Sequence, residues 1–306
     1  MTLSGPDFII PGASKSGTTS LYHYLNEHED IFLPETKELH FFERDNKYKE
    51  GLSEYESYFP PADDGRIAGE VTPTYFNHGI VYEQSAHTTY KWSPDDDAPK
   101  RIAESYPNIK LIITLRNPLT RANSQFWKNY RQGRERADTF EEAIREELAG
   151  GRSKEDHPLC WLYRNEYVTH IERWLDLFER EQIHFIIFER WIQNPKQTLN
   201  ELCEFLGVEP KSSWSRSGDQ KNVGGMPRSV AINRFYQDHI RDTALGALLR
   251  KYRITHRLDA FNSSEGYPEL SDDAKRLLTN RFAPELAELE GLIEADLDIW
   301  RKEMEV

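Results

Sequence analysis

The sequence predicts an α/β fold in which a parallel sheet is flanked by helices. Short apolar runs suited to buried strands recur along the chain, and stretches with helical periodicity separate them. The predicted strands cover residues 8–10, 67–69, 111–115 and 184–188. Because a helix between two strands allows them to run parallel, this alternation indicates a doubly wound sheet. Ligands of such sheets bind at the carboxyl ends of the strands.

Seven further segments are predicted to be helices from the spacing of their apolar residues. They cover residues 19–26, 53–58, 99–105, 118–131, 140–148, 162–180 and 195–206. The segment 229–306 is also helical in pattern, and its apolar stripe is suited to packing on the sheet. We therefore predict one domain over residues 1–306, with a core at 1–228 and a helical C-terminal part.

The loop 86–98 is predicted to be an exposed insertion. It holds the run Asp95, Asp96 and Asp97, and such a run of like charges is usually a solvated surface. We therefore assign it no chemical role.

The composition excludes several classes of protein. A hydrophobic fraction of 38% with 30% charged residues is typical of a globular chain. The net charge of −13 argues against a nucleic-acid partner, because a phosphate backbone requires a basic surface. Two cysteines make no case for a disulfide framework or a metal cluster. Without a signal peptide or an apolar stretch of about 20 residues, the chain is predicted to be cytoplasmic, with no integral membrane association.

The segment from Phe8 to Leu21 is the most informative part of the chain. An apolar strand is followed by a loop of small residues that contains Lys15, and Gly17 then opens an amphipathic helix. Unpaired backbone N–H groups and the helix dipole face the same point in such a turn. Lys15 can reach an anion held there. We therefore predict a site for a phosphate-like group near the N-terminus.

This loop differs from a Walker A loop in the position of its lysine. Gly12 and Gly17 have the Walker spacing, but Thr18 stands where the lysine belongs. A lysine after the second glycine reaches the β- and γ-phosphates of a nucleoside triphosphate. Lys15, inside the loop, suits a ligand with one phosphate and one further anionic group. An ordinary Gly/Ser-rich turn and a true triphosphatase are the two alternatives.

A second anion site is predicted where the strand 111–115 ends. Arg116 follows the strand, Asn117 can cap the next helix, and Pro118 fits its first turn. Ser124 lies two turns into that helix. An arginine fork with a hydroxyl suits a phosphate group, whereas an arginine alone more often forms a structural salt bridge.

The two segments resemble those of sulfotransferases that use 3′-phosphoadenosine 5′-phosphosulfate (PAPS). Residues 14–19, Ser-Lys-Ser-Gly-Thr-Thr, are similar to the family's 5′-phosphosulfate loop. Arg116, Pro118, Arg121 and Ser124 are similar to its R-x-P-x-x-R-x-x-S element for the 3′-phosphate. The resemblance implies a P-loop-like fold and PAPS as co-substrate.

Three further segments resemble the branch that contains the heparan sulfate enzymes. Residues 37–42 are similar to its E-x-H-F-F segment, residues 69–76 to its E-K-T-P-x-Y-F segment, and Tyr167 with Trp174 to its Y-x6-W helix. The resemblance covers about residues 8–228. Val71 stands where that branch carries a lysine that helps to bind a sulfated polymer, which disfavours a heparan-like acceptor.

The resemblance implies a set of residues that bind the co-substrate. They are Lys15, Ser16, Gly17, Thr18, Thr19, Ser20, Arg116, Ser124, Tyr167, Lys221, Gly224 and Arg228. Lys15 would neutralise the leaving phosphate, as electrostatic stabilisation does in phosphoryl transfer. Because Lys15 supplies positive charge and no carboxylate cluster has metal-ligand spacing, no metal is predicted.

Glu38 and His40 are the candidates for the general base. In an extended segment two residues this far apart point the same way, and Phe41 and Phe42 beside them could raise the pKa of a carboxylate. The resemblance favours Glu38, and His40 is the alternative because many cytosolic sulfotransferases use histidine. A third interpretation is that both residues only shape the mouth of the site.

The expected acceptor is a small molecule, glycolipid or saccharide that offers a hydroxyl or, as second choice, an amine. Glu70 is expected to contact it or to orient the site, Trp92 is expected to contact it, and Glu189 is expected to cap a helix. Two other functions are carried as alternatives: a P-loop-like, ATP- and Mg-dependent small-molecule kinase and a non-catalytic nucleotide-binding protein. The sequence makes no prediction of oligomeric state.

Overall fold

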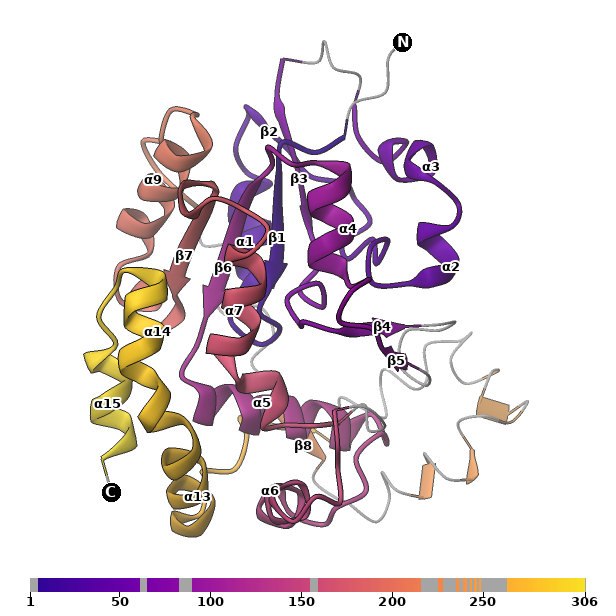
Figure 1. Cartoon of the computed structure of the whole chain (residues 1–306), viewed down its shortest axis with the longest axis vertical. Helices are drawn as coiled ribbons and strands as arrows, with labels where there is room; N and C mark the ends of the chain where they lie inside the picture. The colour runs from indigo at the N-terminus through magenta and orange to yellow at the C-terminus, as the bar shows by residue number, and fades with distance from the viewer. Residues whose placement is uncertain are drawn as a thin grey trace.

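A five-stranded sheet forms the centre of the computed structural model (Figure 1). The structure describes residues 5–60, 65–82, 90–154, 159–215, 225–227, 235–236, 239–240, 243, 245–246, 248 and 263–305. The strands of the sheet are β1 (Phe8–Gly12), β2 (Ile31–Phe32), β3 (Ile67–Val71), β6 (Lys110–Leu115) and β7 (Ile183–Ile187). Their order is β2-β3-β1-β6-β7, and all four pairings are parallel. The α/β prediction is confirmed.

Helices cover both faces of the sheet. The first face packs on α1 (Thr18–Leu25), α8 (Phe188–Gln193) and α9 (Pro195–Leu206). The second face packs on α4 (Ala98–Ser105), α5 (Pro118–Arg131) and α7 (Tyr167–Leu175). Phe8 and Ile10 point to the first face and Ile9 to the second, as the alternation of side chains along a strand requires. Shorter helices are α2 (Asp45–Tyr48), α3 (Leu52–Glu56) and α6 (Phe140–Leu148).

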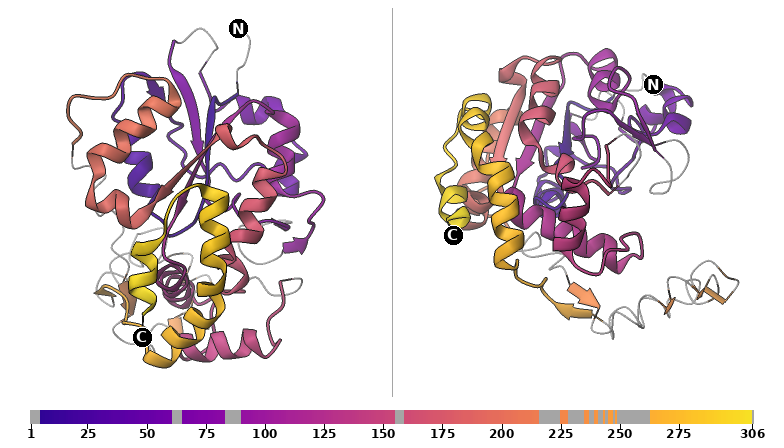
Figure 2. Two further views of the ribbon diagram at one scale, coloured as in Figure 1. Left: turned by 60° about the vertical axis from the view of Figure 1, so that its left-hand side comes forward. Right: turned by 60° about the horizontal axis from the view of Figure 1, so that its bottom comes forward.

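The C-terminal helices lie against α5, α6 and α7 (Figure 2). They are α13 (Asp272–Phe282), α14 (Leu286–Ile293) and α15 (Asp298–Met304), with the 3₁₀ turn η4 (Ala283–Glu285) between the first two. Their apolar stripe joins the core of the second face, which confirms the predicted packing. None of the helices in the described part of the chain is long and apolar enough to cross a bilayer.

Two predicted helical stretches are wrong in part. β9 (Ser263–Glu265) pairs antiparallel with β8 (Gly225–Pro227), a long-range contact that local periodicity does not reveal. The stretch 162–180 contains η1 (Tyr163–Asn165) and α7 but is interrupted at Glu166, whose ψ of 78° is not helical. Another 3₁₀ turn, η2 (Arg180–Gln182), follows it.

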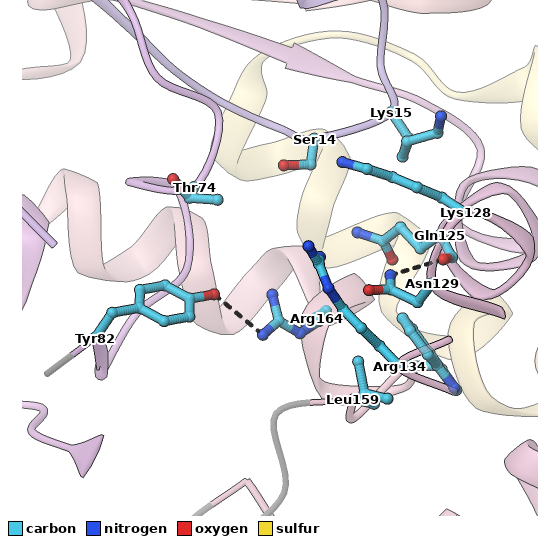
Figure 3. Close-up of a pocket in the computed structure, with 11 residues that line it drawn as sticks. Ser14, Lys15, Thr74, Tyr82, Gln125, Lys128, Asn129, Arg134, Leu159 and Arg164 are labelled. Atoms are coloured by element: carbon cyan, nitrogen blue, oxygen red, sulfur yellow. Dashed lines mark hydrogen bonds between the residues drawn. The ribbon is translucent and has the colours of Figure 1, made fainter. Parts of the chain in front are cut away.

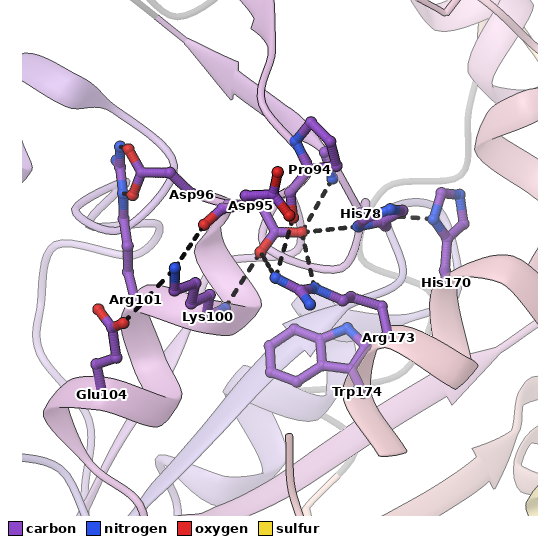
Figure 4. A network of polar contacts seen from close by, with 12 residues as sticks. His78, Pro94, Asp95, Asp96, Lys100, Arg101, Glu104, His170, Arg173 and Trp174 are labelled. Carbon is purple, nitrogen blue, oxygen red and sulfur yellow. Dashed lines mark hydrogen bonds and ion pairs between the residues drawn. The ribbon is translucent and has the colours of Figure 1, made fainter. Parts of the chain in front are cut away.

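The prediction for loop 86–98 is wrong in part: Asp95 and Asp96 are exposed as predicted, but other described residues of the segment are not. β5 (Tyr90–Trp92) pairs with β4 (Ile80–Tyr82), and the Asp97 side chain is fully buried. Asp97 caps α4 by accepting a hydrogen bond from the backbone N–H of Lys100 (3.2 Å), and it also contacts His78 and Arg173 at 2.8 and 3.1 Å. Figure 4 shows Lys100, His78 and Arg173 in this network of polar contacts. These hydrogen-bond donors compensate for the burial of the charge. Asp97 therefore has a structural role.

Candidate functional site

The turn from β1 into α1 presents an open helix N-terminus. Gly17 caps α1 at φ 88°, and a Cβ there would lie 2.4 Å from the Trp191 ring, so glycine is required for both reasons. No side chain caps this N-terminus, and the first turn holds no acidic residue. The backbone N–H groups and the positive end of the helix dipole can therefore receive an anion.

The two predicted anion sites are adjacent. The Arg116 Nη1 donates a hydrogen bond to the carbonyl oxygen of Lys15 (3.2 Å), which joins the end of β6 to the loop after β1. Burial lowers the pKa of Lys15 to about 8, with further lowering from the charges of Arg116 and Arg131. A bound anion would relieve this repulsion. The Lys15 ammonium also donates to the hydroxyl of Tyr267 (3.3 Å), which no sequence pattern indicated.

Tyr167 is hydrogen-bonded to the backbone of Arg116. Its hydroxyl donates to the Arg116 carbonyl oxygen (2.7 Å), and the residue is only 2% exposed. Burial raises its pKa, so the hydroxyl stays protonated. The hydroxyl thus holds the backbone of Arg116, and the expected contact of Tyr167 with the co-substrate stays a prediction. Ser124 is also buried, within α5.

Glu189 connects this strand end to the C-terminal helix, and it is not a helix cap. Its carboxylate accepts hydrogen bonds from the backbone N–H of Asn117 (2.9 Å) and from the indole N–H of Trp300 (2.8 Å). The Trp300 ring stacks on Tyr167, with centroids 5.8 Å apart. α15 therefore supports the segment that carries Arg116.

Arg121 of the R-x-P-x-x-R-x-x-S element holds the loop and is 1% exposed. Its Nε donates to the carbonyl oxygen of Ser14 (2.9 Å), and its Nη1 donates to that of Arg164 (2.6 Å). Through Arg121, α5 ties the phosphate loop to the turn η1.

Glu38 and His40 do not lie in an extended segment as predicted. Both adopt left-handed backbone conformations, with φ of 64° and 55°. Together with Lys15 (φ 73°), they make up three of the four described non-glycine residues with positive φ. Such conformations cost about 1–3 kcal/mol each and cluster at functional sites. The backbone therefore sets these three residues apart independently of any motif.

Their side chains form a chain of polar contacts. His40 Nε2 lies 3.7 Å from Glu38 Oε2, and His40 Nδ1 bonds to the fully buried Glu43. The hydroxyl of Thr74 donates to the same Glu43 oxygen (2.8 Å). On the other side, Lys37 Nζ bridges Glu38 Oε1 (3.3 Å) and the hydroxyl of Thr19 (2.7 Å). The base candidates are thereby linked to the first turn of α1.

Glu70 is buried beneath this loop, at 1% exposure, and cannot contact an acceptor directly. Its carboxylate accepts hydrogen bonds from the hydroxyls of Tyr55 (2.5 Å), Thr72 (2.5 Å) and Tyr75 (2.9 Å). The Tyr75 oxygen in turn accepts the backbone N–H of Phe41 (2.8 Å). Of the two expected roles of Glu70, the structure favours orientation of the site.

Replacing Glu70 with glutamine should remove a pH-dependent penalty on folding. Burial, together with the charge of Glu43, raises the pKa of Glu70 from 4.5 to about 7, although its hydrogen bonds act in the opposite direction. Because the folded-state pKa is above the unfolded value, this group's stabilisation is complete below about pH 4.5 and is lost as the pH rises through 7. The shift corresponds to roughly 3 kcal/mol. Urea denaturation at pH 5 and pH 8 measures it.

From pH 5 to pH 8, the free energy of unfolding of the native protein should therefore fall by more than that of the Glu70→Gln protein. Glu54→Gln, at an exposed position of α3, is the matched control and should show no such gain. Equal pH dependence of the native and Glu70→Gln proteins would contradict the raised pKa.

A cavity of about 80 Å³ opens beside Lys15 (Figure 3). Its lining comes from the phosphate loop, the loop after β3, β4, α5 and the segments around residues 134 and 159–164. Trp92 does not line it. The Trp92 ring instead packs edge-on against His78 and Tyr163, so the expected acceptor contact is not supported. Lys221, Gly224 and Arg228 lie outside the described residues.

Sequence reasoning missed several residues of this site: Lys37, Glu43, Thr74, Lys128, Arg134, Arg164 and Tyr267. Lys37, Glu43 and Thr74 lie within or next to the segments 37–42 and 69–76, so closer attention to those segments could have found them. The other four are brought in by packing, and no local pattern marks them.

Known proteins are similar to this chain in sequence and in fold. It is 30% identical over 217 residues to a bifunctional heparan sulfate N-deacetylase/N-sulfotransferase of Drosophila melanogaster, covering 69% of this chain and 20% of that protein. It is 32% identical over 204 residues to the human heparan sulfate glucosamine 3-O-sulfotransferase 3B1, covering 67% of this chain and 46% of that protein. The chain thus matches less than half the length of either relative.

A crystal structure of a sulfotransferase from Alicyclobacillus acidocaldarius is similar over nearly the whole length of both chains. Its TM-score is 0.67 at 26% identity, and the match covers 97% of this chain and 99% of that one. The family model for the sulfotransferase domain matches residues 5–220, which include the loop 14–19, the segment 37–42 and Arg116. This chain belongs to the sulfotransferase domain family.

Proposed function

We propose that this protein transfers a sulfuryl group from PAPS to a hydroxyl group of an acceptor. The observation that carries the proposal is the hydrogen bond between Arg116 and the Lys15 carbonyl, which brings two anion sites together. The N-terminus of α1 would hold the 5′-phosphate, and Arg116 with Ser124 would hold the 3′-phosphate. The open helix end and the repulsion that lowers the pKa of Lys15 fit such an anionic ligand.

PAPS supplies the sulfuryl group and a phosphate leaving group when it is bound. Lys15 would place its ammonium at the bridging oxygen and compensate the charge that develops there. Glu38 would accept the proton of the acceptor hydroxyl. His40 would orient the Glu38 carboxylate, because its other nitrogen is fixed by the buried Glu43.

The acceptor is proposed to be a small molecule, glycolipid or saccharide. The names of the relatives point to a saccharide, heparan sulfate, but Val71 replaces a lysine that this branch uses for a sulfated polymer. A single domain over residues 1–306 and a cytoplasmic location stay predictions. No feature of the site favours the kinase alternative.

Thermal unfolding in the presence of EDTA tests the donor site. Adenosine 3′,5′-bisphosphate at 100 times its Kd should stabilise the protein by about 2.7 kcal/mol, which raises Tm by roughly 4 °C for a chain of this size. AMP should raise Tm by less than the bisphosphate does, because it has no 3′-phosphate for Arg116 and Ser124. No shift with the bisphosphate, together with a shift by ATP once Mg²⁺ is restored, would contradict the proposal and support the kinase alternative.

A further inference from the structure

The cavity beside Lys15 concentrates positive charge in an acidic protein. Four of its eleven lining residues are cations, and no aspartate or glutamate is among the described residues that line it. The cations are Lys15, Lys128, Arg134 and Arg164. The whole chain, in contrast, has 52 acidic and 39 basic residues. Figure 3 shows the cavity with these side chains around it.

Lys128 is the most informative of the four. It lies in the last turn of α5 and is half-buried. Burial lowers its pKa, the charge of Lys15 lowers it further, and the charge of Glu38 opposes this lowering only in part. Within the described part of the chain, its ammonium has no hydrogen-bond or ion-pair partner. Because burying an ammonium without a partner is costly, this arrangement points to an anionic ligand.

The cavity lies next to the proposed donor site but has a different lining, so its ligand would be distinct from the donor. Ser14 and Lys15 line the cavity, but the first turn of α1, Arg116 and Ser124 do not. At the opposite side lies Thr74, which donates to Glu43 next to His40. The cavity therefore extends from the group proposed to act on the leaving phosphate towards the loop that carries the proposed base. An acceptor must occupy this space.

We propose that the acceptor carries an anionic oxyacid group, a carboxylate, sulfate or phosphate, which Lys128, Arg134 and Arg164 bind. The proposal rests on the function proposed above. Two guanidinium forks and one ammonium suit the planar or tetrahedral oxygens of such a group. A volume of about 80 Å³ compares with roughly 10–15 Å³ for one water, so an anionic group and the atoms next to it fit.

This arrangement also explains how the chain can do without a lysine at position 71. Anion recognition comes instead from α5, the segment after it and η1. Arg121 couples these parts, because it donates to the carbonyl oxygens of both Ser14 and Arg164. The acceptor's anionic group and the phosphate loop are thus held in a defined relation, with the acceptor hydroxyl directed towards Lys15 and Glu38.

Calorimetric titration of the protein saturated with adenosine 3′,5′-bisphosphate tests the proposal. The probes are glucuronate, glucose 6-sulfate and glucose 6-phosphate, with neutral glucose as reference. At least one anionic probe should bind ten times more tightly than glucose or better, and the preferred probe identifies the oxyacid. Binding of all three anions no more tightly than glucose would overturn the proposal.

Variants of the cations that line the cavity test whether the anionic probe binds there. Lys128→Met and Arg134→Gln should each raise the Kd of the anionic probe about tenfold, while the Kd of the bisphosphate changes less than twofold. Lys196→Met, which removes the same charge from the exposed surface of α9, should change neither. Weaker bisphosphate binding with an unchanged anion preference would assign these cations to the donor and overturn the proposal. Failure of the native protein to bind the bisphosphate would instead count against the proposed function.

Discussion

Replacing Lys15 with alanine is expected to lower kcat for sulfuryl transfer by about 10²–10³-fold, the loss typical of removing one group that stabilises developing charge. Lys15 is half-buried, lines the cavity and lies in the loop that leads into α1. Steady-state kinetics with PAPS and a panel of acceptors measure the effect.

The backbone contacts of the loop should survive this change, because Arg116 bonds to the carbonyl oxygen of residue 15 and not to its side chain. The Lys15→Ala protein should therefore bind adenosine 3′,5′-bisphosphate with a Kd within about tenfold of the native value. Lys100→Ala, at a surface pair with Glu104, is the control and should retain full activity. Full activity of a folded Lys15→Ala protein would refute the mechanism.

The lowered pKa of Lys15 adds a pH signature to the same prediction. A pKa of about 8 in the free protein means that the ammonium loses its proton as the pH rises through 8. The kcat/KM for PAPS should therefore fall above about pH 8, because this parameter reports on groups of the free enzyme. That fall should be absent from the residual activity of Lys15→Ala.

Replacing Glu38 with glutamine is expected to lower kcat by about 10²–10⁴-fold, the range typical of a general base. Glutamine keeps the size of the side chain and a carbonyl oxygen for Lys37, but it cannot accept the proton of the acceptor. Among the described residues, Glu38 is connected to the proposed co-substrate site through Lys37 and Thr19, so bisphosphate affinity should change little. The kcat and the bisphosphate Kd should be measured in parallel.

Glu35→Gln provides a matched control. Glu35 is exposed on the same loop, and the change removes the same charge. The kcat of Glu35→Gln should stay within a factor of two of the native value. The assignment of the base fails if Glu38→Gln keeps its activity while His40→Asn loses it, since the proton would then go to the imidazole.

Local patterns were sufficient for most of the core. Alternating apolar runs and helical spacing predicted the four longer strands of the sheet, because these strands are buried and show near-continuous hydrophobicity. The predictions failed where a distant partner decides the structure. β8 and β9 exist through pairing with each other, and Asp97 is buried because His78 and Arg173 surround it.

The sequence by itself determined the donor side of the site. The strand–loop–helix pattern, Lys15 within it, and Arg116 at the end of a neighbouring strand follow from short-range chemistry and from the rule that parallel strands present ligands at one edge. The rule puts both residues at one edge of the sheet, and their contact, a 3.2 Å hydrogen bond from Arg116 to the Lys15 carbonyl oxygen, is a finding of the structure.

Only the tertiary structure brings together the residues of the proposed acceptor side. Glu43 and Thr74 meet His40 across two loops, and Lys128, Arg134 and Arg164 reach the cavity from separate segments. Charged side chains of this kind look like ordinary surface residues in a sequence, because periodicity reports which face is apolar and not what a polar face encloses. Burial turns the same charges into a binding site by removing the water that would screen them.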